Sequence, residues 1–223
     1  NRSYLEVTIQ KIGRFMELNE QVTNMQLGDK RTLQGQWVMS HYYGSGPSIM
    51  VQDNFNNAND ALNDDPWVHV REKWQASSEE ERKEVGAIVS EYQSFWNGHT
   101  DEMRRIDWEN NHVYSEEADF NSNFILVIGK YNTSGNQQEM GQAYHDWVTV
   151  PAVESGVALA GNFSFHLTGS GPDVMVANAY ASMHEFATGL EGATSETSDA
   201  RRKFWSLVEG DHEDQILIHQ GHI

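Results

Sequence analysis

The sequence lacks cysteine and has few basic residues. Without cysteine, the 223-residue chain has no disulfides, thiolate metal sites, iron–sulfur clusters or thiol nucleophile. It contains 15 Lys and Arg against 33 Asp and Glu, a formal net charge of −18, and so lacks the clustered positive charge that nucleic-acid binding needs. The longest apolar run, Phe124 to Ile128, is too short to cross a bilayer. We therefore expect no nucleic-acid partner and no membrane insertion.

The remaining composition is that of a folded, acidic protein. Hydrophobic residues make up 38% and aromatic residues 11% of the chain, which is enough to build a core. The absence of cysteine, the acidity and the polar, Asn-rich sequence fit a secreted or periplasmic protein. We take export as an expectation.

An internal repeat is the strongest feature of the sequence. Residues 41–51 read HYYGSGPSIMV and residues 166–176 read HLTGSGPDVMV, with seven of eleven positions identical. Upstream, LEVTIQK at 5–11 parallels FILVIGK at 124–130, so that Lys11 corresponds to Lys130. Downstream, FWNGHTDEM at 95–103 parallels FWSLVEGDHEDQI at 204–216. The three matches keep their order, which predicts two related domains, 1–115 and 116–223.

Each half is predicted to follow the order β-α-β-β-α-β. Apolar spacing at Phe15, Leu18, Val22 and Met25 indicates a helix after the first strand, and Pro151 is expected to kink or end its counterpart. Ser78 and Glu81 form a capping box that starts another helix, and 63–78 is interpreted as an insertion that covers one face or pocket. Strands are predicted at 4–11, 37–43, 49–52 and 101–108, and again at 124–131, 163–168, 174–178 and 213–219.

Two such split βαβ units in one chain resemble the dimeric α/β-barrel superfamily in its fused, tandem form. Antibiotic-biosynthesis-monooxygenase-like, EthD-like and chlorite-dismutase-like proteins belong to it. The resemblance rests on element order and pseudo-symmetry, without a signature motif. It implies an α+β fold in which two ferredoxin-like repeats pack as an intramolecular barrel. It also implies that a small organic molecule or haem binds between a sheet and its helices.

Polar residues that both halves retain are the candidate functional residues. In an extended chain, residues two apart lie on one face, so each His-x-Asp pair can join an imidazole to a carboxylate. Such a pair can act as a general base or hold a divalent metal. Six residues are predicted to be catalytic: His41, His166, His99, His212, Asp101 and Asp214.

These residues are predicted to form two quasi-equivalent sites. In a fused barrel, the second strand of one half can lie beside the fourth strand of the other half. His41 would then join His212 and Asp214, and His166 would join His99 and Asp101. The alternative is structural, because a His-x-Asp at a strand start often caps a turn.

The functional expectations stay broad. We expect a small-molecule ligand bound in a barrel pocket, with a cofactor-free or metal-assisted reaction as one option. A non-catalytic binding module and a haem protein of the chlorite-dismutase type are the alternatives, so neither catalysis nor a cofactor or metal is assigned. A fused pseudo-dimer closes its own barrel, which allows a monomer or a homodimer.

Overall fold

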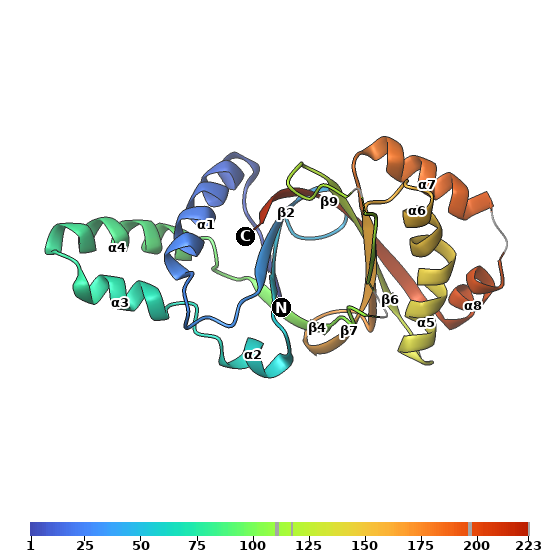
Figure 1. The fold of residues 1–223 in the computed structure, drawn as a ribbon, viewed down its shortest axis with the longest axis horizontal. Coiled ribbons are helices and arrows are strands. Elements are labelled where there is room, and N and C mark those ends of the chain that lie inside the picture. The colour runs from blue at the N-terminus through green and yellow to red at the C-terminus, as the bar shows by residue number, and fades with distance from the viewer. Residues whose placement is uncertain (110–111, 117, 196–197, 223) are drawn as a thin grey trace. The chain divides into compact units, whose positions relative to one another are not determined.

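The computed structural model describes residues 1–109, 112–116, 118–195 and 198–222, and it shows an α+β fold (Figure 1). The strands are β1 (Arg2–Leu5), β2 (Gly35–Gly44), β3 (Ile49–Asn54), β4 (Thr100–Arg105), β5 (His112–Tyr114), β6 (Ile125–Asn132), β7 (Ala160–Gly169), β8 (Val174–Tyr180) and β9 (Glu209–His222). The α-helices are α1 (Ile12–Gln26), α2 (Ala58–Asn63), α3 (Val68–Ala76), α4 (Glu79–Ser94), α5 (Gln137–Tyr144), α6 (Val150–Glu154), α7 (Met183–Ser195) and α8 (Asp199–Leu207).

The strands of the described residues form one sheet in the order β4-β1-β3-β2-β9-β6-β8-β7-β5. Strand β4, the first in this order, also pairs with β7. This pairing closes eight of the strands into an antiparallel barrel, and β5 pairs with β7 outside the closed set. The second strand of each half therefore pairs with the last strand of the other half, β2 with β9 and β7 with β4. The predicted placement of these strands beside each other is confirmed, and so is the predicted fold class.

The chain divides into two compact units that do not coincide with the sequence halves. Unit 1 comprises Asn1–Val38, Pro47–Asp101 and His222–Ile223, and unit 2 comprises Met39–Gly46 and Glu102–Gly221. Strands β2 and β4 each run from one unit into the other. The repeat boundary at 115/116 describes sequence similarity and stays a prediction.

The core of unit 1 forms where α1 covers its strands. Phe15, Leu18 and Val22 recur on one face of α1 and are fully buried, as their spacing predicts. The capping box is also present, because the Ser78 side chain accepts from the Glu81 amide while the Glu81 carboxylate accepts from the Ser78 amide. The insertion 63–78 contains α3, which packs against α1 and α4.

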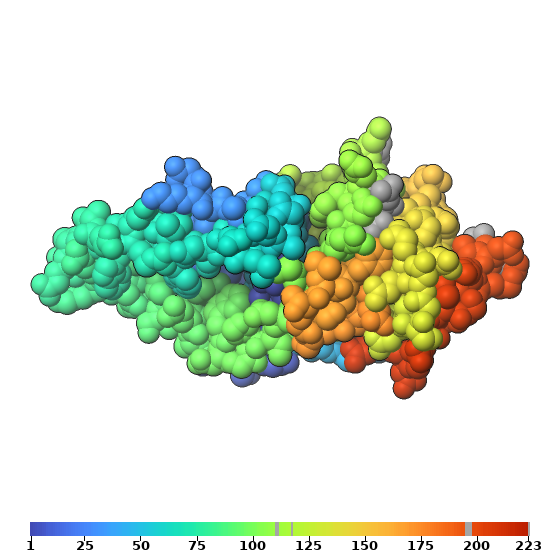
Figure 2. Space-filling model, turned by 90° about the horizontal axis from the view of Figure 1, so that it is seen from below, coloured from blue at the N-terminus to red at the C-terminus, as the bar shows by residue number. Residues whose placement is uncertain are grey.

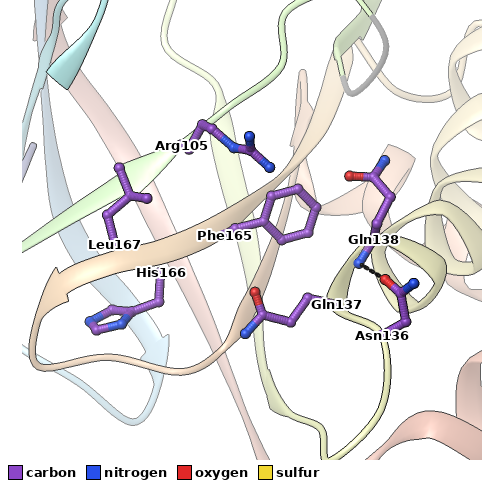
Figure 3. A pocket seen from close by; sticks show the side chains of 7 residues that line it. All are labelled: Arg105, Asn136, Gln137, Gln138, Phe165, His166 and Leu167. Atoms are coloured by element: carbon purple, nitrogen blue, oxygen red, sulfur yellow. Dashed lines mark hydrogen bonds between the residues drawn. The ribbon is translucent and has the colours of Figure 1, made fainter.

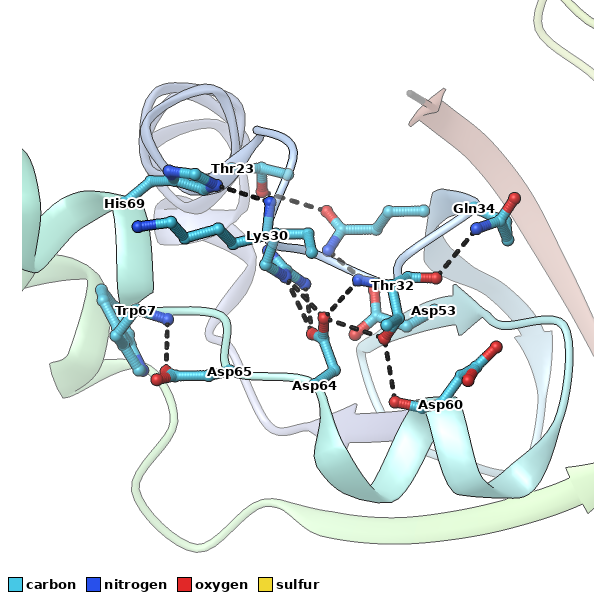
Figure 4. Close-up of polar contacts among 12 residues, drawn as sticks. Thr23, Lys30, Thr32, Gln34, Asp53, Asp60, Asp64, Asp65, Trp67 and His69 are labelled. Carbon is cyan, nitrogen blue, oxygen red and sulfur yellow. Dashed lines mark hydrogen bonds and ion pairs between the residues drawn. The ribbon is translucent and has the colours of Figure 1, made fainter.

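A hydrogen-bonded polar network lies within unit 1 (Figure 4). Asp64 accepts bonds from the Arg31 guanidinium and from the Thr32 amide at 2.9 Å. Burial alone would raise the pKa of Asp64, but these donors hold it below its ordinary value. Gln36 donates to Asp53 at 2.9 Å, and burial raises the pKa of that carboxyl group. Polar side chains thus occupy part of the helix-covered side of this sheet.

Aromatic side chains fill the corresponding layer of unit 2. Phe204 of α8 is fully buried between Tyr131, Tyr144 and Trp147, with ring centroids 4.9–5.8 Å apart. In Figure 1, α5, α6 and α8 lie on one side of strands β6–β8. The two units therefore differ in the side chains that pack on their strands.

Several predicted boundaries are corrected by the structure. The strand predicted at 4–11 ends at Leu5, because the chain leaves the sheet and Lys11 becomes the N-cap of α1. Lys130 lies in β6, so the Lys11/Lys130 match is not structural. Pro151 does not end its helix, because it occupies the first turn of α6, where proline's missing N–H is tolerated. Strand β4 ends at Arg105 rather than 108, and the short strand β5 was not predicted.

The repeated Gly-Ser-Gly-Pro turns are explained by close approach of β9 and β4. Gly44 has φ 93°, and a Cβ added there would overlap the backbone oxygen of Asp214. A Cβ at Gly46 would lie 2.6 Å from the Gln215 side-chain nitrogen, and one at Gly171 would overlap the Glu102 carboxylate. Gly46 and Gly171 are repeat equivalents, as are Gln215 and Glu102. Both halves therefore keep glycine where a polar side chain packs on the turn.

Replacing Gly44 by alanine should test this constraint. The variant suffers both positive-φ strain and overlap with the backbone of β9, whereas Gly210→Ala has φ 73° and no atom within 4 Å of the added Cβ. We expect Gly44→Ala to lower the free energy of unfolding by about 2 kcal/mol more than Gly210→Ala does, measured by urea unfolding. Equal losses would show that the turn has no tight contact.

A π-helical turn, His145–Thr149, joins α5 to α6 and buries an imidazole. His145 is 8% exposed, and neither ring nitrogen has a hydrogen-bond partner among the described residues. Burial lowers the pKa of His145, although the neighbouring Asp146 carboxylate opposes this. The folded protein therefore holds this imidazole in its neutral form to lower pH than the unfolded chain does.

The sign of the resulting pH dependence is fixed. Below the unfolded-state pKa of about 6.5, the unfolded chain binds the proton first, so stability falls as pH decreases towards the folded-state pKa. We expect the free energy of unfolding to drop between pH 8 and pH 5.5, and the drop to shrink in His145→Gln. His184→Gln, an exposed position on α7 of the same unit, should retain the wild-type drop. An unchanged drop in His145→Gln would contradict the assignment.

Candidate functional site

Unit 2 has a pocket of about 450 Å³ between the end of β7 and the start of α5 (Figure 3). In the space-filling view, the β7–β8 hairpin (orange) adjoins α5 (yellow) on one face (Figure 2). The volume of the pocket lies within the range of small-molecule sites. We call it the Phe165 pocket, and its lining residues are Arg105, Asn136, Gln137, Gln138, Phe165, His166 and Leu167.

Phe165 and Arg105 together form an aromatic and cationic wall. Phe165 is 4% exposed and belongs to the aromatic core of unit 2, so its ring is held in place. Arg105 is its partner across the β4–β7 ladder, and the guanidinium carbon lies 5.4 Å from the ring centroid. The strand register therefore places a positive charge over the pocket's buried ring.

His166 offers a free proton-accepting nitrogen. Its Nε2 lies 3.1 Å from the backbone oxygen of Gly169. A carbonyl oxygen can only accept, so Nε2 carries the hydrogen and donates it. In the neutral ring Nδ1 is then the basic nitrogen, and no hydrogen bond to Nδ1 is found among the described residues. The β7–β8 turn thus sets the tautomer of a half-buried histidine that lines the pocket.

The start of α5 supplies the amide groups of the pocket. The Asn136 side chain caps α5 by accepting from the Gln138 amide at 2.9 Å. Gln137 donates its Nε2 to Asp173 at 3.3 Å, and Asp173 also accepts from the Thr133 amide at 3.0 Å. Because Asp173 engages the NH₂ group, the side-chain oxygen of Gln137 remains available to a ligand. Polar groups of fixed orientation thus face an apolar ring.

The structure describes contacts of the predicted catalytic residues. The His212 and Asp214 side chains do meet, at 3.2 Å, but His212 stacks on Tyr131. The contact of the His41 ring is Gln215, at 3.3 Å, and Gln215 alternates with Asp214 along β9. Adjacent strand residues point to opposite faces, so the contact of His41 with Gln215 does not itself bring His41 to Asp214, and the grouping of His41 with His212 and Asp214 stays a prediction.

The residues of the other predicted group belong to different units. His99 and Asp101 form a pair at 3.2 Å in unit 1, where the His99 ring also bonds the Trp96 backbone oxygen. His166 belongs to unit 2, so its grouping with them concerns both units and stays a prediction. No group of three metal-ligating side chains is found in the part of the chain that the structure describes. Of the six candidates, His166 is the one that lines the Phe165 pocket; the catalytic role of each stays a prediction.

Arg105 and Phe165 were missed because each occurs once. The candidate residues were those that occur in both halves of the repeat, and neither Arg105 nor Phe165 does, because their repeat equivalents are Ile218 and Ser40. A weak signal was present: Arg104 and Arg105 are adjacent cations in a predicted strand, so one of them had to point away from the barrel interior.

Arg104 points the other way and forms a buried ion pair. Its side chain is 3% exposed and the Glu102 carboxylate 0%, with 2.9 Å between Nη1 and Oε2. The same guanidinium donates to the backbone oxygens of Pro172 and Ser164 at 2.9 and 3.0 Å. Arg104 therefore ties β4 to strand β7 at Ser164 and to the β7–β8 turn at Pro172.

The comparisons with known proteins agree with this fold. No family model and no curated protein matches the sequence. An anthrone oxidase-like protein superposes over 100% of this chain and 90% of its own, with TM-score 0.59 and 12% identity. The chain has the dimeric α/β-barrel fold. A candidate monooxygenase from Fusobacterium nucleatum subsp. nucleatum ATCC 25586 matches at TM-score 0.60 and 10% identity, covering 99% of this chain and 91% of the other.

A third structure that is similar to this chain is that of a candidate monooxygenase from Lactobacillus acidophilus NCFM. It matches at TM-score 0.58 and 8% identity, over 99% of this chain and 93% of its own. At such low sequence identities, these similarities show the fold alone. The predicted dimeric α/β-barrel fold is confirmed. Among the described residues, no helix has the length and apolarity to span a membrane.

The buried ion pair should be essential for stability. Arg104→Met removes the guanidinium that pairs with the buried Glu102 carboxylate, and we expect the free energy of unfolding to fall by about 3–5 kcal/mol in urea titrations. Arg105→Met, at the neighbouring exposed position, should change it by less than about 1 kcal/mol. The double variant Glu102→Gln/Arg104→Met should recover part of the loss. Equal stability of the two single variants would contradict this role.

Proposed function

We propose that the chain binds a small aromatic molecule in the Phe165 pocket and that His166 accepts a proton from it. The observation that carries this proposal is a pocket lined by both Phe165 and His166, in which the contact of His166 Nε2 with the Gly169 oxygen leaves Nδ1 as the unprotonated nitrogen of the neutral ring. Apolar contact with Leu167 and with the part of Phe165 that lines the pocket would hold the ligand, and the glutamine amides would orient it. Proton transfer to a positioned imidazole is a common catalytic step.

The reaction class that we propose is oxidation by dioxygen. The similar barrels named as anthrone oxidase-like and candidate monooxygenase support this class. With anthrone as a model substrate, His166 would take a proton from the ring methylene and leave the electron pair on the ring system. Dioxygen then oxidises this carbanion; one oxygen atom becomes the new carbonyl and the other leaves as water, which balances anthrone plus O₂ against anthraquinone plus H₂O.

Binding can be tested with naphthol, whose fluorescence reports both binding and ionisation. Leu167 is 48% exposed and lines the pocket, while Leu190 is 50% exposed on α7 outside it. We expect Leu167→Ala to weaken naphthol binding by about three- to five-fold, because apolar contact area is lost, and Leu190→Ala to leave it unchanged. Identical effects of the two variants, or no binding, would overturn the pocket as the site.

Proton transfer is tested separately by His166→Gln, which retains a side-chain donor for the Gly169 oxygen. We expect naphthol to bind this variant but to lose the ionised emission, and anthrone-dependent oxygen uptake to fall at least about 100-fold. Wild-type binding without oxygen uptake would favour the non-catalytic module. The haem alternative stays a separate prediction that an absorbance scan checks.

A further inference from the structure

We infer that the ligand of the Phe165 pocket is an organic anion, and that Arg105 selects it by binding a carboxylate-type group. This inference rests on the proposed function and adds the substrate class. It starts from the electrostatics of the pocket, which differ from those of the chain. The chain has more than twice as many acidic as basic residues, yet none of the seven lining residues is acidic.

Arg105 has a positive charge that no carboxylate of the described residues neutralises. Its neighbour Arg104 pairs with Glu102, and Lys130 and Lys203 of unit 2 pair with Glu213 and Glu139. Within the described residues, Arg105 has no such ion pair; its contact is the face of Phe165. A guanidinium stacked on a ring keeps its N–H edge free, and that edge matches the two oxygens of a carboxylate.

The nearby acidic side chains are already engaged. Glu139, in the first turn of α5, pairs with Lys203 at 2.7 Å. Asp173 accepts from the Thr133 amide and from Gln137, whose side chain lines the pocket. Neither carboxylate faces Arg105 as an ion-pair partner. An incoming anion would therefore meet one unpaired cation together with the amide groups of α5.

The lining also indicates where the anionic group lies on the ligand. The Arg105 side chain extends towards the Phe165 ring, whereas the His166 side chain extends away from that ring (Figure 3). A ligand that uses both would place its carboxylate and its acidic proton at separate positions on the ring system. Arg105 then orients the ring, and His166 receives the proton.

The inference is tested with naphthoate and its neutral isostere naphthamide, titrated against the intact chain. Arg105→Met is compared with Arg201→Met, since the Arg201 guanidinium also lies 5.4 Å from a ring, that of Trp147, outside the pocket. We expect wild type and Arg201→Met to bind naphthoate about five-fold more tightly than naphthamide. In Arg105→Met this preference should disappear, while naphthamide affinity stays within two-fold of wild type. The wild-type preference should also diminish with added NaCl.

The outcomes separate this inference from the proposed function. Equal binding of the two probes by wild type, or a preference that survives in Arg105→Met, overturns anion selection while the aromatic pocket stands. Loss of the preference in both arginine variants points to general surface charge and also overturns the inference. Failure of wild type to bind either probe overturns the pocket itself.

Discussion

The contact between a polar side chain and a glycine turn is the constraint on which the barrel depends. Glu102 and Gln215 lie at equivalent positions of the repeat, and each packs where a Cβ on Gly171 or Gly46 would stand. This contact brings the last strand of one half against the hairpin of the other. At the β7–β8 turn it is strengthened by Arg104, whose guanidinium binds both the Glu102 carboxylate and the turn carbonyls. The same turn then orients His166 through the Gly169 oxygen.

Much of the fold could be predicted because the sequence contains it twice. Hydrophobic period and turn residues located the hairpins, the α1 stripe and the capping box at Ser78, and the order of elements predicted the barrel. Boundaries were less certain where an apolar residue is exposed. Ile9 is 79% exposed in the turn before α1, yet it made 4–11 resemble a strand. Burial depends on tertiary contacts that a local pattern does not contain.

The candidate site was harder to predict for a different reason. Residues that are kept in both halves of the repeat mark features that both halves share, and the shared features are the turn geometry and the strand pairing. His41 and His166 illustrate this: one meets Gln215, while the other lines a pocket. The pair at His212 and Asp214 was found correctly as a pair, but strand alternation turns it away from Gln215. Register decides which face a residue occupies, and the sequence alone did not determine it.

The two units also show why a repeated fold need not carry a repeated site. In unit 1, Asn19 and Gln36 bond to each other at 2.9 Å within the buried layer, and Tyr92 donates to Asn19 at 2.9 Å. Burial raises the pKa of Tyr92, so its hydroxyl stays protonated and donates to Asn19 within this network. In unit 2 the equivalent layer is aromatic, and it extends to the ring of Phe165 at the pocket. An aromatic ligand can continue that layer, whereas it would have to break the polar one. The layer of unit 2 therefore suits the proposed aromatic ligand better than the layer of unit 1 does.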